Sequence, residues 1–299
     1  MESLPTEILH VIFKLACTDG GPTGVRLALV SKHFRVVARA VRFHSVALRD
    51  RASVDIFHRA FVQEIKEAQQ GSENPCTPIV QHLFVAERAT QRSPIKKVLT
   101  LAAPTLETLA LAAHNIPLSL LFSVAPTLPA LRELTVLGHT PKYFSELPPG
   151  KCVRVLPALK MLHLILEDFT TSSKPTTISS DLKRWSCAAP KLHGVRLSRA
   201  PQAATLSWLS AMLVPKREDR PSPSVRAIAL EVVAHRRGEP DQLPEIEACE
   251  GKTPAEIALC VTRPRKSYGA CPALETKLES EWTDRVEGWD GGWPRVVLI

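Results

Sequence analysis

The chain has 299 residues, 44 % of them apolar, which is enough to bury a core in one large domain or in one small and one larger domain. Its formal net charge of +8 favours acidic partners, either protein or nucleic acid. The sequence has no run of about 18 apolar residues and no basic segment at its start, so it predicts neither a membrane span nor a secretory signal. We therefore expect a soluble intracellular protein, cytoplasmic or nuclear.

The residues that could carry chemistry form no catalytic or metal-binding pattern. Seven cysteines stand at wide spacings without a CxxC pair, which is typical of reduced intracellular thiols. The motifs GxSxG, GxGxxG and HExxH and the P-loop are absent. We therefore predict no catalytic residue, no metal and no cofactor, and do not expect an enzyme. Five histidines fall in or just after expected strands, and we expect them at the surface: His82, His114, His139, His163 and His193.

The first segment predicts a short helix with two apolar stripes. Pro5 suits the first turn of a helix, and Glu7 lies near the positive end of the helix dipole. We interpret one stripe as packing the protein's own helical unit and the other as contacting a partner; the alternative is that both are core. The first stripe is Ile8, Ile12 and Leu15, and the second is Leu9, Phe13 and Ala16.

The next segment predicts a loop, two further helices and the entry to a strand. Residues 18–24 can only be a loop because they are rich in Gly, Pro and Thr, and residues 25–30 form a short apolar helix. Ser31 is suited to cap the helix that follows, and residues 43–48 then enter a strand. The third helix has an inward stripe of Phe34, Val37 and Val41 beside a basic stripe of Arg35, Arg39 and Arg42.

Two motifs in this region resemble the F-box. The first is LPTEIL at residues 4–9, followed by Ile12-Phe13, and the second is LALVSKHFR at residues 27–35. The ending ARAVRFHSVAL at residues 38–48 is similar to F-box proteins of mushroom-forming fungi. The resemblance departs from the family pattern at Phe34, where a tryptophan is common, and in the loop after the first helix.

The resemblance implies a binding role. F-box modules are three-helix units that dock onto an acidic Skp-type adaptor, which links them to a cullin–RING ubiquitin ligase. Residues 25–51 hold seven Lys and Arg against one acid, which suits an acidic partner. By position, the resemblance implies that the adaptor is contacted by Leu4, Pro5, Ile8, Leu9, Ile12, Phe13, Leu27, Leu29, Val30 and Phe34.

A spacing of proline and apolar residues recurs six times further along the chain. Each copy has Pro, any residue, then apolar residues separated by two positions and by one. Successive copies are 26, 25, 28, 33 and 33 residues apart. The copies are Pro78 with Val80, Leu83 and Val85; Pro104 with Leu106, Leu109 and Leu111; Pro129 with Leu131, Leu134 and Val136; Pro157 with Leu159, Leu162 and Leu164; Pro190 with Leu192, Val195 and Leu197; and Pro223 with Val225, Ile228 and Leu230.

Helical patterns separate these copies. Amphipathic faces are expected within residues 95–102, 118–125, 182–189 and 206–213. A strand and a helix repeated in this way resemble leucine-rich repeats, whose units stack because none can bury its apolar face alone. The usual Asn or Cys after each strand is missing, so the match is degenerate. The alternative is an ordinary α/β layer fold with chance periodicity.

The predicted architecture is therefore α/β, an N-terminal three-helix F-box followed by an irregular leucine-rich-repeat-like solenoid with strands concave and helices convex. The predicted units are residues 1–50 (F-box), 51–75 (a linking helix capped by Ser53, and a loop), 76–235 (solenoid, with a seventh strand possible at 257–261) and 236–299 (C-terminal extension or cap). Trp282, Trp289 and Trp293 are interpreted as covering the exposed end of the solenoid, with a substrate anchor as the alternative.

These features together predict a non-catalytic substrate receptor of a Skp–cullin–RING ubiquitin ligase, which holds an unknown protein substrate on its repeats. The loops 170–177 and 216–222 could lie at the binding face or be neutral insertions. One alternative is a repeat scaffold that is not engaged in a ligase. A nucleic-acid binder that uses the basic stripe is a less favoured alternative, because aromatic-interleaved basic stretches are missing elsewhere.

Overall fold

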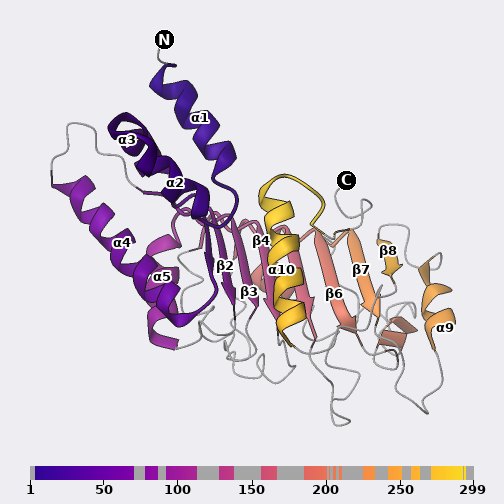
Figure 1. Ribbon diagram of the computed structural model, residues 1–299. Coiled ribbons are helices and arrows are strands. Elements are labelled where there is room, and N and C mark those ends of the chain that lie inside the picture. The colour runs from indigo at the N-terminus through magenta and orange to yellow at the C-terminus, as the bar shows by residue number, and fades with distance from the viewer. Residues whose placement is uncertain are drawn as a thin grey trace.

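The computed structural model is α/β and contains one parallel sheet of eight strands in the order β1 to β8 (Figure 1). It describes residues 4–70, 78–86, 92–112, 128–137, 156–166, 185–200, 202, 205–206, 209–210, 225–232, 242–250, 257–262, 271–291 and 293. The strands are β1 (Ser45–Leu48), β2 (His82–Ala86), β3 (Thr108–Ala112), β4 (Glu133–Leu137), β5 (Met161–Ile165), β6 (Gly194–Ala200), β7 (Ala227–Val232) and β8 (Ala258–Thr262).

The six strands predicted from the repeated spacing are β2 to β7, and all six are confirmed. Their apolar positions are in register, since Leu83 pairs with Leu109, Leu109 with Leu134, and Leu134 with Leu162. The two outer strands, β1 and β8, lie where the sequence predicts a strand entry and a seventh strand. Because β1 pairs with β2, the sheet begins inside the range 1–50 predicted for the F-box.

Successive strands are joined at their starts by one repeated backbone contact. A carbonyl oxygen just before one strand accepts two N–H groups from the residues that open the next strand, at N···O distances of 2.8–3.2 Å. The prolines at positions 104, 129, 157 and 190 lie in the turns that precede these contacts. The carbonyls belong to His44, Gln81, Glu107, Arg132, Lys160 and His193.

One face of the sheet forms the main core with helices α4 (Arg51–Gln69), α5 (Arg92–Ala102) and α9 (Leu243–Glu247). The predicted helical face at 95–102 is confirmed, because its four apolar side chains are almost fully buried. Trp185 from the 182–189 prediction and Leu209 from the 206–213 prediction are also buried in this core. The predicted helix 118–125, the loops 170–177 and 216–222, and Leu182 and Leu213 lie outside the described residues.

Helix α4 is part of this core rather than a separate linker. Its Val54, Phe57 and Phe61 side chains are buried against β1 and β2 residues. The prediction that Ser53 caps the helix is wrong by one turn, because the helix begins at Arg51. Asp50 accepts a hydrogen bond from the Ser53 N–H at 2.7 Å, and the Ser53 hydroxyl accepts one from the Asp50 N–H at 3.1 Å. This reciprocal pair is a capping box.

Helices α1 (Thr6–Ala16), α2 (Pro22–Val30) and α3 (Lys32–Val41) form a unit at the β1 end of the sheet (Figure 1). Ser31 caps α3 as predicted, since its hydroxyl accepts a hydrogen bond from the Phe34 N–H at 3.1 Å. The predicted loop is shorter than expected, because Pro22 is suited to the first turn of α2. Asp19 supports that turn by accepting a hydrogen bond from the Thr23 N–H at 3.0 Å.

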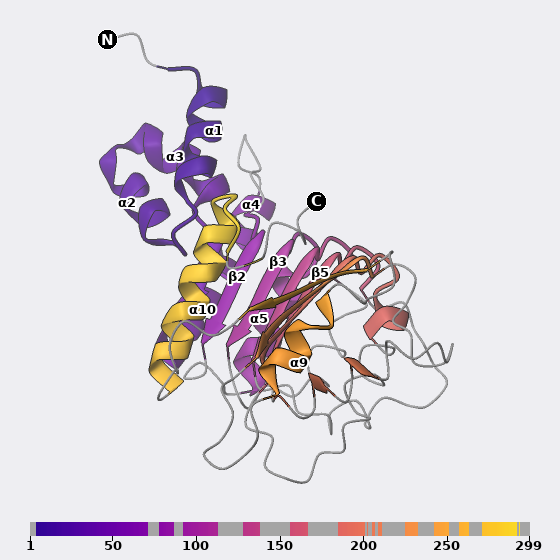
Figure 2. The same cartoon turned by 90° about the vertical axis from the view of Figure 1, so that its right-hand side faces the viewer.

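Helix α10 (Cys271–Val286) covers the other face of the sheet, opposite the main core (Figure 2). Trp282 packs there on Phe84 of β2, with ring centroids 5.7 Å apart, and Trp293 lies 6.2 Å from His163 of β5. The interpretation that the tryptophans cover the end of the sheet is therefore wrong. Two of them lie on its face, and Trp289 is exposed.

The loop between α1 and α2 lies along the outer edge of β1. The carbonyl of Gly20 accepts a hydrogen bond from the Ala47 N–H at 3.0 Å, and the Gly20 N–H donates to the Ser45 hydroxyl at 3.2 Å. Gly20 has a φ of 79°, and a Cβ there would lie 2.7 Å from the Cβ of Ala47. Only glycine therefore fits between the helical unit and the sheet edge.

Replacement of Gly20 by alanine is expected to lower the free energy of unfolding by about 3 kcal/mol. The left-handed backbone costs an L-residue about 1–2 kcal/mol, and the clash with Ala47 adds the cost of overpacking. Urea unfolding followed by circular dichroism measures the change. Gly288→Ala is the matched control: its φ is 88° but nothing lies within 4 Å of the added Cβ, so we expect a loss of about 1 kcal/mol. Equal losses would contradict the close approach.

Candidate functional site

The three N-terminal helices expose a large share of apolar side chains. Among the described residues, twelve large apolar side chains are exposed, and nine of them belong to residues 4–36. Exposed apolar patches mark interaction sites on monomeric proteins. Val36 lies on α3, and we call the other eight, which precede α1 or lie on α1 and α2, the N-terminal apolar surface. They are Leu4, Ile8, Val11, Ile12, Leu15, Val25, Leu29 and Val30, which are 45–72 % exposed.

The ten residues predicted to contact an adaptor divide into an exposed and a buried set. Leu9 and Phe13 are buried in the core of the helical unit, and Leu27 and Phe34 pack against that core. The rings of Phe13 and Phe34 meet edge to face with centroids 5.1 Å apart. These four side chains support the surface from behind. The exposed set is Leu4, Pro5, Ile8, Ile12, Leu29 and Val30.

The two stripes predicted on the first helix therefore face different surroundings. The stripe of Ile8, Ile12 and Leu15 is exposed, while Leu9 and Phe13 of the second stripe are buried. Ala16, the third member of the second stripe, is exposed, and its neighbour Cys17 is buried instead. The alternative in which both stripes are core does not describe this helix.

Three members of the N-terminal apolar surface were absent from the predicted contact set: Val11, Leu15 and Val25. Val25 stands four residues before Leu29, and Val11 stands four before Leu15, so each pair shares a helix face. That spacing is the signal in the sequence that could have added them.

The basic stripe on α3 is used largely inside the protein. Arg39 binds Glu64 of α4 at 2.9 Å and also pairs with Glu67, while Arg42 pairs with Glu64. The interpretation that these arginines are available to an acidic partner or to nucleic acid is therefore wrong. They join α3 to α4 and fix the orientation of the helical unit on the core.

The Arg42 pairing offsets an unfavourable burial. Desolvation lowers the pKa of Arg42, and Glu64 acts in the opposite direction. Arg35 is also engaged, because its Nε donates to the carbonyl of Ala28 at 3.1 Å. Arg26 and Lys32 are exposed and make no ion pair with the described residues.

A pair of neutral histidines lies where the helical unit meets the sheet. His44 and His82 meet edge to face with ring centroids 4.8 Å apart, and His82 Nδ1 lies 2.9 Å from the Thr108 hydroxyl. Burial lowers the pKa of His44 to about 4 and that of His82 to about 3, with nearby positive charge adding to both shifts. The expectation of surface histidines is wrong for His163, which is buried, while His82 and His193 are partly exposed. His114 and His139 lie outside the described residues.

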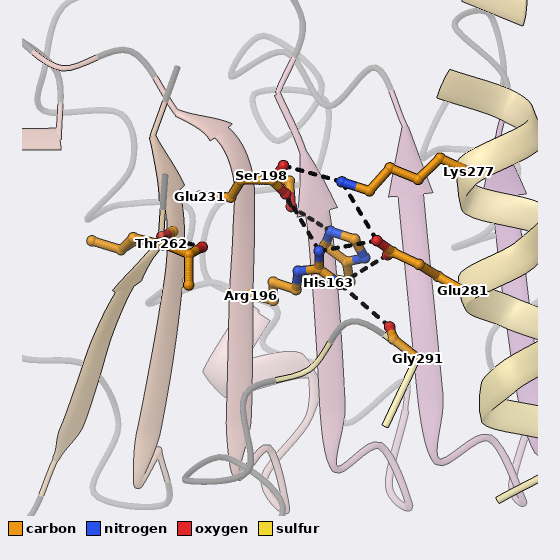
Figure 3. Close-up of polar contacts among 9 residues, drawn as sticks. His163, Arg196, Ser198, Glu231, Thr262, Lys277, Glu281 and Gly291 are labelled. Carbon is orange, nitrogen blue, oxygen red and sulfur yellow. Dashed lines mark hydrogen bonds and ion pairs between the residues drawn. The ribbon is translucent and has the colours of Figure 1, made fainter. Parts of the chain in front are cut away.

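A second polar group lies on the α10 face of the sheet and combines residues of β5, β6, β7 and α10 (Figure 3). Arg196 donates to both oxygens of Glu281, at 2.9 and 3.3 Å, and to Glu231 at 3.3 Å. Lys277 binds the other Glu231 oxygen at 3.1 Å. Two bases and two acids thus balance where α10 meets the sheet.

The order of proton donation in this group is fixed by the Ser198 hydroxyl. Burial would raise the pKa of Glu231, but Lys277, Ser198 and Arg196 together hold it below its usual value, so it is a carboxylate. The hydroxyl has one proton, which it donates to Glu231 at 2.8 Å. His163 Nε2, 2.8 Å away, must therefore donate to Ser198. Burial holds the pKa of His163 well below its usual value, so the ring is neutral.

This arrangement does not activate a nucleophile. An activated serine gives its proton to a histidine, whereas Ser198 accepts from His163 and gives its proton to a carboxylate. No cluster of three or more His, Cys, Asp or Glu among the described residues could hold a metal ion. Cys17, Cys249 and Cys260 are thiols without a disulfide among the described residues, and burial raises the pKa of Cys17 to about 11. The ion pairs of this group instead hold α10 on strands β6 and β7 of the sheet.

Two buried histidines, His44 and His163, and the partly exposed His82 predict that acid destabilises the protein. Each is neutral in the folded chain and titrates near 6.5 in the unfolded chain, so the unfolded state takes up more protons as the pH falls. Between pH 7 and pH 5 each histidine is expected to remove about 2 kcal/mol of unfolding free energy. Urea unfolding at the two pH values measures the loss.

The variant His82→Gln is expected to reduce this loss by about 2 kcal/mol, because one proton fewer is bound on unfolding. The control is His33→Gln, which makes the same substitution at an exposed histidine of α3. An unchanged slope in His82→Gln would show that the pKa of His82 is the same in the folded and the unfolded chain, and would contradict the lowered pKa.

Comparison with known proteins does not assign the chain to a family. No protein-family model matches the chain, and no curated protein matches its sequence. Within the described part of the chain, no helix is long and apolar enough to span a membrane. The function must therefore be argued from the N-terminal apolar surface, from the sheet and from the motifs in the sequence.

Proposed function

We propose that this protein is a non-catalytic substrate receptor of a Skp–cullin–RING ubiquitin ligase, with an F-box in its first fifty residues and leucine-rich-repeat-like units after it. The observation that carries the proposal is the N-terminal apolar surface. A three-helix unit with an F-box-like sequence keeps its own core inside and leaves a stripe of α1 and a stripe of α2 exposed. A folded unit with this distribution of apolar side chains needs a partner to cover them.

The proposed occupant of this surface is an acidic Skp-type adaptor. Ile8 and Ile12 of α1 and Leu29 of α2 present branched apolar side chains, which contribute strongly to binding once they are desolvated. Arg26 and Lys32 stand exposed beside them and supply positive charge that would steer an acidic partner. Arg39 and Arg42 contribute through their pairing with Glu64 and Glu67 of α4.

The ladder of parallel strands supports the second half of the proposal. Each of β1 to β8 pairs only with its sequence neighbours, at the spacing of the Pro-led repeat. We propose that this ladder is an irregular leucine-rich-repeat-like solenoid, with strands concave and helices convex, that presents a surface to a protein substrate. A repeat scaffold outside any ligase shares this architecture, and only binding of the adaptor separates the two.

The double variant Ile8→Asp and Ile12→Asp is expected to abolish adaptor binding without unfolding the chain. Both side chains are about half exposed, so the substitutions remove partner contacts and not core. Loss of the two apolar contacts is expected to raise the dissociation constant at least a hundredfold, since each hot-spot residue contributes about 2 kcal/mol or more to binding. Titration calorimetry with the purified adaptor measures the change.

The matched control is Ile56→Asp on α4, which places the same charge at an exposed isoleucine outside the N-terminal apolar surface. It should bind the adaptor as the unmodified chain does. If the unmodified chain shows no binding at micromolar adaptor, the proposed function is wrong. If binding survives the double variant, the function stands and the assigned surface is wrong.

A further inference from the structure

The α10 face of the sheet is built to receive a helix. Its strands carry small side chains, among them Ala47, Ala86, Ala110 and Ala112, which leave room for a helix to lie close to the sheet. Helix α10 fills that space with one narrow apolar stripe at i, i+4 and i+8. The stripe consists of Leu274, Leu278 and Trp282, each less than 7 % exposed.

A charged stripe runs beside the apolar one on the same helix. Lys277, Glu281 and Arg285 stand at i+3, i+7 and i+11, and each meets an opposite charge from the sheet. Lys277 pairs with Glu231 of β7, Glu281 with Arg196 of β6, and Arg285 with Glu133 of β4. The sheet face therefore offers an acid, a base and an acid, which match a basic, an acidic and a basic residue in that order along a docked helix.

Helix α10 is outside the repeated ladder that holds the sheet together. It follows β8 in the chain but contacts β2 and β3 at the opposite end of the sheet. Every strand pairs with its sequence neighbours without it, and the main core lies on the other face. Its departure would break no strand pairing. It would expose the apolar stripe of α10 and the sheet side chains beneath it, among them Phe84, Leu137 and Ile165, and it would remove Glu281 from Arg196.

We infer that this face is a helix-docking site which α10 occupies within the chain, and that a partner competes for it with an amphipathic helix of the same code. That helix carries apolar residues at i, i+4 and i+8 beside a base, an acid and a base at i+3, i+7 and i+11. The acid satisfies Arg196, and the bases satisfy Glu231 and Glu133. In the proposed receptor role, the competing partner is the protein substrate, and this identification rests on the proposed function.

The test uses a fluorescent peptide of residues 272–291 and the full-length chain. Ser280→Pro weakens α10 from its exposed side, because Ser280 touches no sheet residue through its exposed side chain and proline removes a helical hydrogen bond. The peptide is expected to bind the Ser280→Pro chain at least tenfold more tightly than the unmodified chain, as measured by fluorescence anisotropy. The control chain is Ser280→Ala, which should behave as unmodified.

A peptide with the charges inverted, Lys277→Glu, Glu281→Lys and Arg285→Glu, keeps the apolar stripe and is expected to lose the binding. Equal binding of both peptides, or no gain in the Ser280→Pro chain, would overturn the inference.

Hydrogen exchange of the unmodified chain provides a measurement that needs no variant. Amides of α10 should exchange at least tenfold faster than those of β4 and β5, because α10 opens without the ladder. Equal rates would show that α10 is an integral part of the fold and would overturn the inference. Adaptor binding is measured on the same Ser280→Pro chain and should be unchanged, so failure of the adaptor interaction and failure of helix exchange are separate results.

Discussion

The fold depends on the backbone contact at the start of strands β2 to β7. One carbonyl oxygen accepts two N–H groups from the chain that returns one repeat later, and this occurs from His44 to His193. The contact sets each strand beside the preceding one and in the same direction. Once the first strand is placed, the direction and the register of the following strands are determined, and so are the two faces of the sheet. Mainly leucine and valine alternate onto one face. The other face combines alanines and polar residues with the larger side chains Phe84, Leu137 and Ile165.

The strands could be predicted because their signal is local. A proline in the turn, an apolar residue ahead of the strand and two more inside it lie within eight positions. The three apolar residues are buried in the main core in every repeat. The helices on the main core follow from the same kind of short periodicity, as at residues 95–102. The cap of α4 was misplaced by one turn, since Asp50 and Ser53 are both good capping residues and only the fold decides between them.

The contacts that could not be predicted join residues far apart in the chain. Arg39 meets Glu64 across 25 positions, and Arg196 meets Glu281 across 85. Nothing near Arg196 in the sequence distinguishes it from a solvated arginine. The position of α10 on the sheet could not be predicted either. The alanines that leave room for the helix are only weakly apolar, so their pattern in the sequence does not indicate a packing surface. The surface on α1 was predictable as a spacing, but burial was needed to show which of its two stripes faces outward.

The two proposed binding surfaces follow different physical rules. The N-terminal apolar surface is open and mainly apolar, so its affinity would come from desolvation and depend little on salt. The α10 face is occupied and is framed by ion pairs, so its exchange would depend on salt and on the charge order of the competing helix. Since α1 to α3 are held to α4 and β1 by fixed contacts, the two surfaces keep a constant separation and orientation.

The contact between Gly20 and β1 also bears on how the chain is made. An open edge of a parallel sheet is a template for other chains, and at β1 the carbonyl of Gly20 already occupies the Ala47 N–H. Residues 1–48 leave the ribosome before strands β2 to β8 are made. The nascent sheet therefore begins with its outer edge protected, and each later repeat can add only on the inner side, in the order of synthesis.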